Sequence, residues 1–274
     1  MKVQPCCLTC LKSLADKTIA LSAGDETLAA DCHHLIDTLW DPNATPPAIS
    51  NVLLKHIRQQ TGVADPYFQA KVREYEEARR AFAELRDRFS LSLEDTLRLS
   101  ALGNSMDFFI DSQYDLNNFI FSSDMAKIEE AIYIKEKDTL ILGDNMGDFI
   151  FDMPFVEYLE GLGKNVYYAV RERPVQNDLS MEDVRRFGFD DAFHRIISIG
   201  TGKVGMKKED LTGTVKALWE GNGAVIAKGM GNFETISEFH NERSVVYIMK
   251  VKCQAVAQAV KQDLGTYIAS TGGE

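Results

Sequence analysis

The sequence predicts an α/β protein in which a mostly parallel sheet is flanked by helices and preceded by a helical N-terminal subdomain. Two observations support this fold class. Residues 1 to about 100 have a helical pattern, whereas from about residue 125 short apolar runs alternate with amphipathic segments. Such alternation is typical of a parallel sheet with helices on both faces. We therefore expect a helical subdomain over residues 1–100 and an α/β domain over residues 101–274.

The N-terminal part is expected to consist of helices joined by short connections. Segment 66–89 is rich in charged, helix-forming residues. Its apolar residues recur at steps of three and four, which places them on one face of a helix. That face comprises Phe68, Val72, Tyr75, Ala78, Phe82, Leu85 and Phe89. The proline-rich segment 41–50 is expected to connect two helices.

Apolar runs in the second part are expected to be buried strands. Each is bounded by Gly, Asp or Asn and is largely continuous in apolar residues, as parallel strands covered on both faces are. The runs are TLILG (139–143), NVYYAV (165–170), RIISIG (195–200), GAVIAK (223–228) and SVVYIM (244–249). Helices are expected between them, for example over residues 154–162 and 208–220.

Composition and charge narrow the class of protein. The 274 residues are 45% hydrophobic, so a sizeable core is expected. The net charge of −11 disfavours nonspecific nucleic-acid binding, which depends on Lys and Arg. The sequence has no signal-peptide pattern and no window apolar enough to span a bilayer. We expect a cytoplasmic protein without nucleic-acid or membrane partners, and its five cysteines do not suggest a disulfide scaffold. The oligomeric state is open.

Polar residues gather in the loops that follow the strands, where ligands bind to open parallel sheets. The first such loop, GDNMGDFIFD, places Asp144 and Asn145 at a strand end and Asp148 at the start of the next helix. Adjacent carboxylate and amide oxygens suit hard divalent cations. The alternative is that one of these residues only caps the helix.

Two other segments hold polar residues that either cap a helix or join the same site. In RERPVQNDLSMED, Asn177 and Asp178 precede a helix. They act as caps or bring a second carboxylate beside the first ligands. In GNSMDFF, at the junction of the two parts, Asn104 and Asp107 are polar among apolar neighbours. Both readings stay open for these residues.

A further loop, KGMGNFE, has features of a phosphate site. Lys228 stands at a strand end, and Gly229 and Gly231 let the backbone approach a ligand closely. A Lys beside exposed backbone N–H groups suits a phosphate. Asn232 and Glu234 are candidates for contacts with substrate hydroxyls. The alternative is a turn with a solvated Lys.

Other motifs are incomplete. GTGKVG lacks the spacing of a phosphate loop, no G-x-G-x-x-G follows a strand, and no G-x-S-x-G occurs. A single C-x-x-C without a second pair leaves either a metal site or buried thiols. If these cysteines bind a metal, a site separate from the strand-end loops, the candidate ligands are Cys6, Cys7, Cys10, Cys32, His33 and His34.

Four of these motifs together resemble one known family. GNSMDF (103–108), GDNMGDFIFD (143–152), RPVQND (173–178) and KGMGNFE (228–234) occur in the order of the metal-dependent damage-control phosphatases, formerly the domain-of-unknown-function 89 family. The N-terminal cysteine-containing segment and DPY (65–67) are similar to its smaller prokaryotic branch. The resemblance covers nearly the whole chain, and four motifs in order are more specific than any one alone.

The resemblance implies a Rossmann-like α/β domain and a Mg, Mn, Co or Ni ion held by Asp144, Asn145 and Asp178. It also implies that Lys228 contacts the substrate phosphate and that Asn104 and Asp107 line the pocket. The expected catalytic residues are Asp144, Asp148 and Lys228. The expected substrate contacts are Asn104, Asp107, Asn177, Lys228, Gly229, Gly231, Asn232 and Glu234. One departure is Asp148, where the family often has Glu.

The expected function is hydrolysis of small phosphometabolites such as sugar phosphates, in metabolite damage control. Water is the expected nucleophile, with an aspartyl-phosphate route through Asp144 as the alternative. The alternatives from other classes are a methyltransferase that uses S-adenosylmethionine and a non-catalytic metabolite-binding protein. A haloacid-dehalogenase-type phosphatase is disfavoured because its first strand ends in D-x-D rather than D-N.

Overall fold

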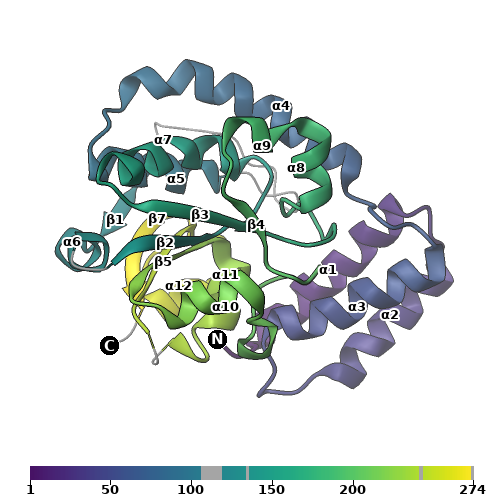
Figure 1. Cartoon of the computed structure of the whole chain (residues 1–274). Helices are drawn as coiled ribbons and strands as arrows, with labels where there is room; N and C mark the ends of the chain where they lie inside the picture. The colour runs from purple at the N-terminus through teal and green to yellow at the C-terminus, as the bar shows by residue number, and fades with distance from the viewer. Residues whose placement is uncertain (106–118, 134–135, 241–242, 273–274) are drawn as a thin grey trace.

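A seven-stranded sheet forms the centre of the molecule in a computed structural model, which describes residues 1–105, 119–133, 136–240 and 243–272. The strand order is β1-β7-β6-β5-β2-β3-β4. Neighbouring strands are parallel except β6 and β7, which are antiparallel. Helices cover both faces of the sheet (Figure 1). The predicted fold class, α/β with a mostly parallel sheet flanked by helices, is confirmed.

All five expected strands are present, and two further strands, β1 and β7, were not expected. The strands are β1 Phe121–Ser123, β2 Glu136–Leu142, β3 Asn165–Val170, β4 Ile196–Ser198, β5 Gly223–Lys228, β6 Val245–Lys250 and β7 Tyr267–Gly272. The helices are α1 Pro5–Leu21, α2 Glu26–Leu39, α3 Pro46–Thr61, α4 Phe68–Leu85, α5 Leu93–Gly103, α6 Met125–Tyr133, α7 Asp148–Gly161, α8 Met181–Phe187, α9 Phe189–Ala192, α10 Gly213–Glu220, α11 Gly229–Ile236 and α12 Gln254–Val260, with short 3-10 turns η1 Arg86–Arg88 and η2 Lys208–Asp210. None of the helices in the described ranges is long and apolar enough to cross a membrane.

Each face of the sheet has its own hydrophobic core, which explains why the strands are continuously apolar. Successive side chains of a strand point to opposite faces. In β2, Ile141 packs into the core under α5 and α7, whereas Leu140 and Leu142 pack into the core under α10, α11 and α12. A strand buried on both faces therefore needs apolar residues at consecutive positions rather than at alternate ones.

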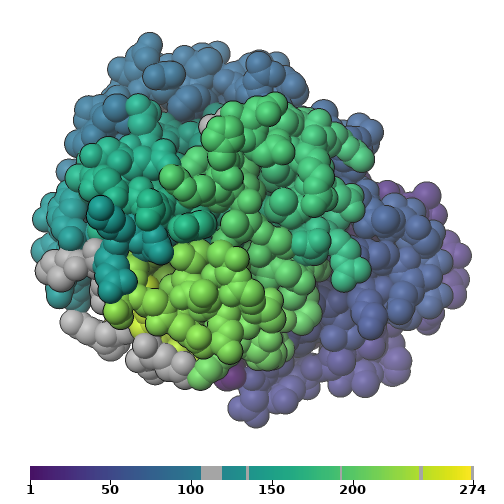
Figure 2. Space-filling model, in the orientation of Figure 1, coloured from purple at the N-terminus to yellow at the C-terminus, as the bar shows by residue number. Residues whose placement is uncertain are grey.

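Helices α1, α2 and α3 gather around a third core beside the sheet and form one flank of the molecule (Figures 1 and 2). Helix α3 begins within the segment that was expected to be a connection. Thr45 accepts a hydrogen bond from the backbone N–H of Ala48, and Pro46 occupies the first turn, where its fixed backbone angle favours helix initiation. The division of the chain at residue 100 stays a prediction.

Helix α4 confirms a helix in the expected segment but not its expected pattern of burial. Ala78 and Leu85 are buried as the periodicity indicates. Two charged residues on the same helix, Lys71 and Glu74, are buried more deeply than most of the apolar stripe. The Lys71 ammonium lies 2.8 Å from carboxylates of both Asp65 and Asp183. A charged residue can be buried when its charged partner is close by. Hydrophobic periodicity does not reveal such residues.

Candidate active site

The candidate site lies where β2, β3, β5 and β6 end, at the edge of the sheet where open α/β sheets bind ligands. A cavity of about 440 Å³ opens there. Its sheet-side wall includes Asp144, Asn145, Asp178 and Lys252, and its other wall comes from α1 and the start of α3. The volume suits a metabolite-sized ligand.

The loops after β2 and β3 are joined by their backbones, which brings the three expected metal ligands together. The N–H of Leu179 donates to the carbonyl oxygen of Asp144 at 2.8 Å. Asn145 and Asp178 pair as an isolated antiparallel bridge. The sequence separates these residues by more than thirty positions, and the adjacency of β2 and β3 in the sheet brings them together.

Arg171, at the end of β3, fixes one of these carboxylates. Its Nε donates to Oδ2 of Asp178 at 2.7 Å, and its two other nitrogens donate to the carbonyl oxygen of Gly205 at 2.8 Å and to Oδ1 of Asn232 at 3.1 Å. The residue is 1% exposed. A buried guanidinium with three fixed acceptors has little freedom, so Arg171 orients Asp178. No motif in the sequence marks Arg171 as a functional residue.

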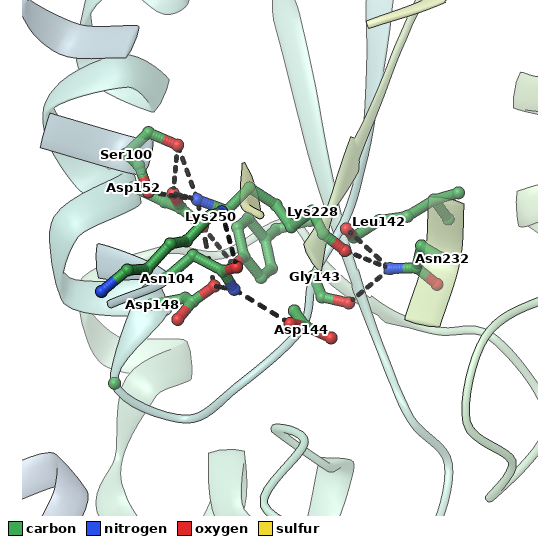
Figure 3. Close-up of polar contacts among 12 residues, drawn as sticks. Ser100, Asn104, Leu142, Gly143, Asp144, Asp148, Asp152, Lys228, Asn232 and Lys250 are labelled. Atoms are coloured by element: carbon green, nitrogen blue, oxygen red, sulfur yellow. Dashed lines mark hydrogen bonds and ion pairs between the residues drawn. The ribbon is translucent and has the colours of Figure 1, made fainter. Parts of the chain in front are cut away.

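Asn104, at the end of α5, orients two further carboxylates (Figure 3). Its Nδ2 donates to Oδ2 of Asp144 at 3.0 Å and to Oδ2 of Asp148 at 2.8 Å. Its Oδ1 accepts from the backbone N–H of Lys250 at 3.2 Å. Asn104 is buried and is not among the residues that line the cavity. Asn104 therefore orients Asp144 and Asp148 through hydrogen bonds without itself facing the cavity.

The side chain of Lys228 lies among Ser100, Asp148 and Asp152 (Figure 3). Its ammonium donates to Oγ of Ser100 at 2.7 Å and to Oδ1 of Asp152 at 2.6 Å, and it is 4.0 Å from Oδ2 of Asp148. The side chain is fully buried and does not line the cavity. Tyr168 donates to the other oxygen of Asp152 at 2.7 Å. The contact of Lys228 with a substrate phosphate stays a prediction.

The glycine that follows Lys228 is required by close packing. Gly229 has a φ of +74°, and a Cβ there would lie 1.8 Å from Oδ2 of Asp144. The carboxylate of Asp144 therefore occupies space that a side chain at position 229 would fill. Any residue with a Cβ would both strain the backbone and displace an expected metal ligand.

The remaining expected contacts divide into two groups. Asn177, Gly231 and Glu234 line the cavity. Asn232 does not: its Nδ2 donates to the carbonyl oxygens of Gly143 and Lys228, at 3.1 and 2.8 Å, so it fastens the strand ends. Asp107 lies outside the described residues.

The acidic residues carry more negative charge than their surroundings balance. Burial, and then repulsion by Asp178 and Asp148, raises the pKa of Asp144 to about 8. Burial raises the pKa of Asp148 to about 7 against the opposing effect of Lys228. Oδ1 of Asp148 is buried and has no hydrogen-bond partner. Oxygen donors with excess buried charge fit a hard divalent cation.

The described residues contain no group of three His, Cys, Asp or Glu side chains arranged to hold a metal ion. The expected site at Asp144, Asn145 and Asp178 includes an amide and only two carboxylates, so it does not depend on such a group. The proposed cysteine site would depend on one. Cys6 and Cys10 are exposed whereas Cys7 and Cys32 are buried, and this separation does not support a second metal site.

Lys252 is the functional candidate that sequence analysis missed. It follows β6 and lines the cavity. Its positive charge lowers the pKa values of three buried carboxyl groups, those of Glu74, Asp144 and Asp148, against the larger effect of burial. The signal was weak: a single Lys two residues after a strand has no motif around it.

Comparison with known proteins identifies the family. The model of the damage-control phosphatase ARMT1-like domain matches residues 3–268. The chain belongs to this family. A damage-control phosphatase of Pyrococcus horikoshii is 27% identical over 98% of this chain and 97% of its own length. One from Archaeoglobus fulgidus is 23% identical over 98% of this chain and 99% of its own.

The fold is shared with a solved structure of the same family. The crystal structure of a DUF89 family protein from Pyrococcus horikoshii has a TM-score of 0.85, with 26% sequence identity and 99% of both chains covered. The resemblance stated from the sequence motifs is thus confirmed. Membership in this family supports a phosphatase role in metabolite repair and gives no support to the methyltransferase or the non-catalytic alternative.

Proposed function

We propose that the protein is a divalent-metal-dependent phosphomonoester hydrolase that acts on small phosphorylated metabolites such as sugar phosphates. The observation that carries the proposal is the convergence of Asp144, Asn145 and Asp178 on one cavity in a chain of the damage-control phosphatase family. These oxygens would hold the ion. A bound Mg, Mn, Co or Ni ion supplies Lewis-acid chemistry and neutralises charge on a phosphate.

Lys252 is the better candidate than Lys228 for contact with the phosphate. Lys252 lines the cavity, whereas the ammonium of Lys228 is buried against Ser100 and Asp152. A cation in the cavity wall attracts an anionic substrate and stabilises charge on the transferring phosphoryl oxygens. Lys228 instead donates to Asp152 and holds its carboxylate beside Asp148.

Water is the nucleophile that the cavity favours. Cys7 lines the cavity, but burial raises the pKa of its thiol to about 11, so little thiolate exists at neutral pH. Oδ2 of Asp144 already accepts a hydrogen bond from Asn104, which ties the carboxylate down as a ligand rather than leaving it to attack. Asp148 is fully buried and does not line the cavity; its Oδ1, which has no hydrogen-bond partner, would orient the attacking water only if that water lies deeper than the cavity wall.

In the described part of the chain, the cavity lining offers groups that can bind hydroxyls but no surface on which a nucleobase would stack. The described lining residues include no aromatic side chain on which a nucleobase would stack. They do include Ser13, Gln176 and Glu234, which can hydrogen-bond to hydroxyl groups. Gln176 has a φ of +45°, a strained conformation that is found at functional sites more often than elsewhere.

The proposal is tested by phosphate release from a panel of sugar phosphates and one aryl phosphate. Each reaction is run in chelator and then with Mg, Mn, Co or Ni restored. We expect release that requires metal and is lost in Asp144→Ala. The matched control is Glu157→Ala, which removes an exposed carboxylate from α7 and should leave turnover unchanged. Metal-independent release, or normal turnover in Asp144→Ala, would contradict the assignment.

A further inference from the structure

Glu74 is a buried carboxylate on α4 that contacts both loops of the candidate metal site. Oε1 accepts a hydrogen bond from the backbone N–H of Gly147 at 3.1 Å, and Oε2 accepts one from Nδ2 of Asn177 at 3.0 Å. Gly147 lies in the loop after β2, and Asn177 lies in the loop after β3. One side chain therefore bridges the two loops that carry the proposed ligands.

We propose that Glu74 is a positioning residue that clamps these two loops together and so fixes the geometry of the metal site. The metal part of this inference rests on the proposed function. The loops also pair directly, for example from the N–H of Met146 to the carbonyl oxygen of Asn177 at 3.0 Å. That pairing aligns the backbones, whereas Glu74 anchors them to α4, a helix more than sixty residues earlier in the chain.

A carboxylate suits this task because both of its oxygens accept hydrogen bonds, so it can satisfy two donors on separate loops. Its burial is costly: burial raises the pKa of Glu74 to about 7, although the two hydrogen bonds and Lys252 oppose the rise. Buried charged groups often contribute little to the stability of the fold, since apolar residues can replace them without loss. Stability is therefore a poor explanation for a buried Glu74. Its position between the two loops points to geometry as the reason for its presence.

Three substitutions separate the clamp from general packing. Glu74→Met has a similar length and removes both acceptors. Glu74→Gln can still accept from Gly147 and can donate to the amide oxygen of Asn177 once that amide turns over, so it restores both contacts without the charge. Lys71→Met is the matched control, because Lys71 is also buried on α4 but pairs with Asp65 and Asp183.

The first readout is hydrogen exchange of the metal-free proteins, which does not depend on catalysis. We expect Glu74→Met to speed exchange in residues 143–148, Glu74→Gln to leave it near the unsubstituted rate, and Lys71→Met to lower the melting temperature without loosening that segment. Unchanged exchange in Glu74→Met would overturn the clamp whether or not the protein binds metal.

The second readout is the dissociation constant for Mn²⁺, measured by calorimetry at pH 8. Loss of a residue that supports metal ligands costs about 10- to 100-fold in affinity, so we expect that loss in Glu74→Met, near-normal affinity in Glu74→Gln, and no loss in Lys71→Met. Equal losses in the Met and Gln variants would show that charge rather than the clamp matters. Absence of binding by the unsubstituted protein would count against the proposed function, whereas binding unchanged in Glu74→Met would count against the clamp alone.

Discussion

The two walls of the cavity are built differently. On the sheet wall, Asp144 accepts a hydrogen bond from Asn104, and Asp178 accepts one from Arg171. Both donors are fixed in turn by further hydrogen bonds. On the helical wall, α1 and α3 present small or apolar groups, and the hydroxyl of Ser50 donates within its own helix to the carbonyl oxygen of Pro47. The sheet wall is fixed by cross-connections between distant segments, whereas the helical wall is a packed surface.

We infer from this difference that the sheet wall carries the catalytic groups and that the helical wall determines which substrates fit. Groups held within a buried network keep a fixed geometry, which transition-state stabilisation requires. Small residues on a helix face can change without disturbing that network. We therefore expect substitutions on the sheet wall to lower kcat and metal affinity, and substitutions on the helical wall to change KM among substrates.

The largest effect is expected from Asp178→Asn. The substitution keeps the shape of the side chain but removes the negative charge that would hold the ion, and Lewis-acid assistance is worth several kcal/mol. We expect kcat/KM to fall on the order of 10³-fold, as measured by phosphate release at saturating metal. The control is Asp190→Asn, an exposed acid on α9. Activity within a few-fold of normal in Asp178→Asn would remove this residue from the metal site.

The two lysines at the ends of neighbouring strands should have separable effects. Lys252→Met removes a cation from the cavity wall, and we expect about a 10²-fold loss of kcat/KM with a smaller loss of thermal stability than in Lys228→Met. Lys228→Met leaves Asp152 as a buried carboxylate without its cation, which should cost about 3–5 kcal/mol of stability. Activity and thermal unfolding are measured on both proteins. A stable, inactive Lys228→Met protein would restore the phosphate contact expected from sequence.

The lysines also show what the sequence could not supply. The strand ends left open whether Asp178 caps a helix or lies beside Asp144 and Asn145, and the structure pairs Asn145 with Asp178 because β2 and β3 are adjacent in the sheet. The order of strands and the direction of long side chains are tertiary properties. Lys228 stands in a recognisable motif but points into the protein, whereas Lys252 has no motif and lines the cavity.

In the helical part, too, the sequence predicted local features but not those that depend on tertiary contacts. Periodicity identified α4 and two of the residues that it buries, Ala78 and Leu85, because apolar spacing is a local property. The buried charges Lys71 and Glu74 were not predicted, because their burial depends on partners more than one hundred positions away, Asp183 and Asn177 respectively. The strand β7 was missed as well: its TG residues and its antiparallel pairing with β6 depart from the pattern of the parallel core.

The charge of the sheet wall predicts how stability depends on pH. The pKa values of Asp144 and Asp148 are raised to about 8 and 7, above their values of about 4 in an unfolded chain. Between these limits the folded, metal-free protein binds more protons than the unfolded one, so its stability falls as pH rises toward 8. A metal ion bound by these carboxylates would have to compete with the protons.

We therefore expect saturating Mn²⁺ to raise the melting temperature more at pH 8 than at pH 6, measured by thermal unfolding with and without chelator. In Asp144→Asn the carboxyl with the highest of these pKa values is absent, so the metal-free protein should lose less stability between pH 6 and 8. An equal rise in melting temperature at both pH values would contradict the charge balance described for this wall.

The smallest effect is expected from the helical wall. Ser13 is half-buried on α1 and lines the cavity, and Ser13→Leu would narrow the space without touching the acidic network. A methylene-scale change in a pocket is worth about 1–3 kcal/mol between substrates. We expect a higher KM for larger sugar phosphates, little change for a small one, and unchanged kcat and Mn²⁺ affinity. A uniform fall in kcat would instead show that the helical wall is part of the same fixed network as the sheet wall, because a loss confined to the transition state cannot come from uniform binding.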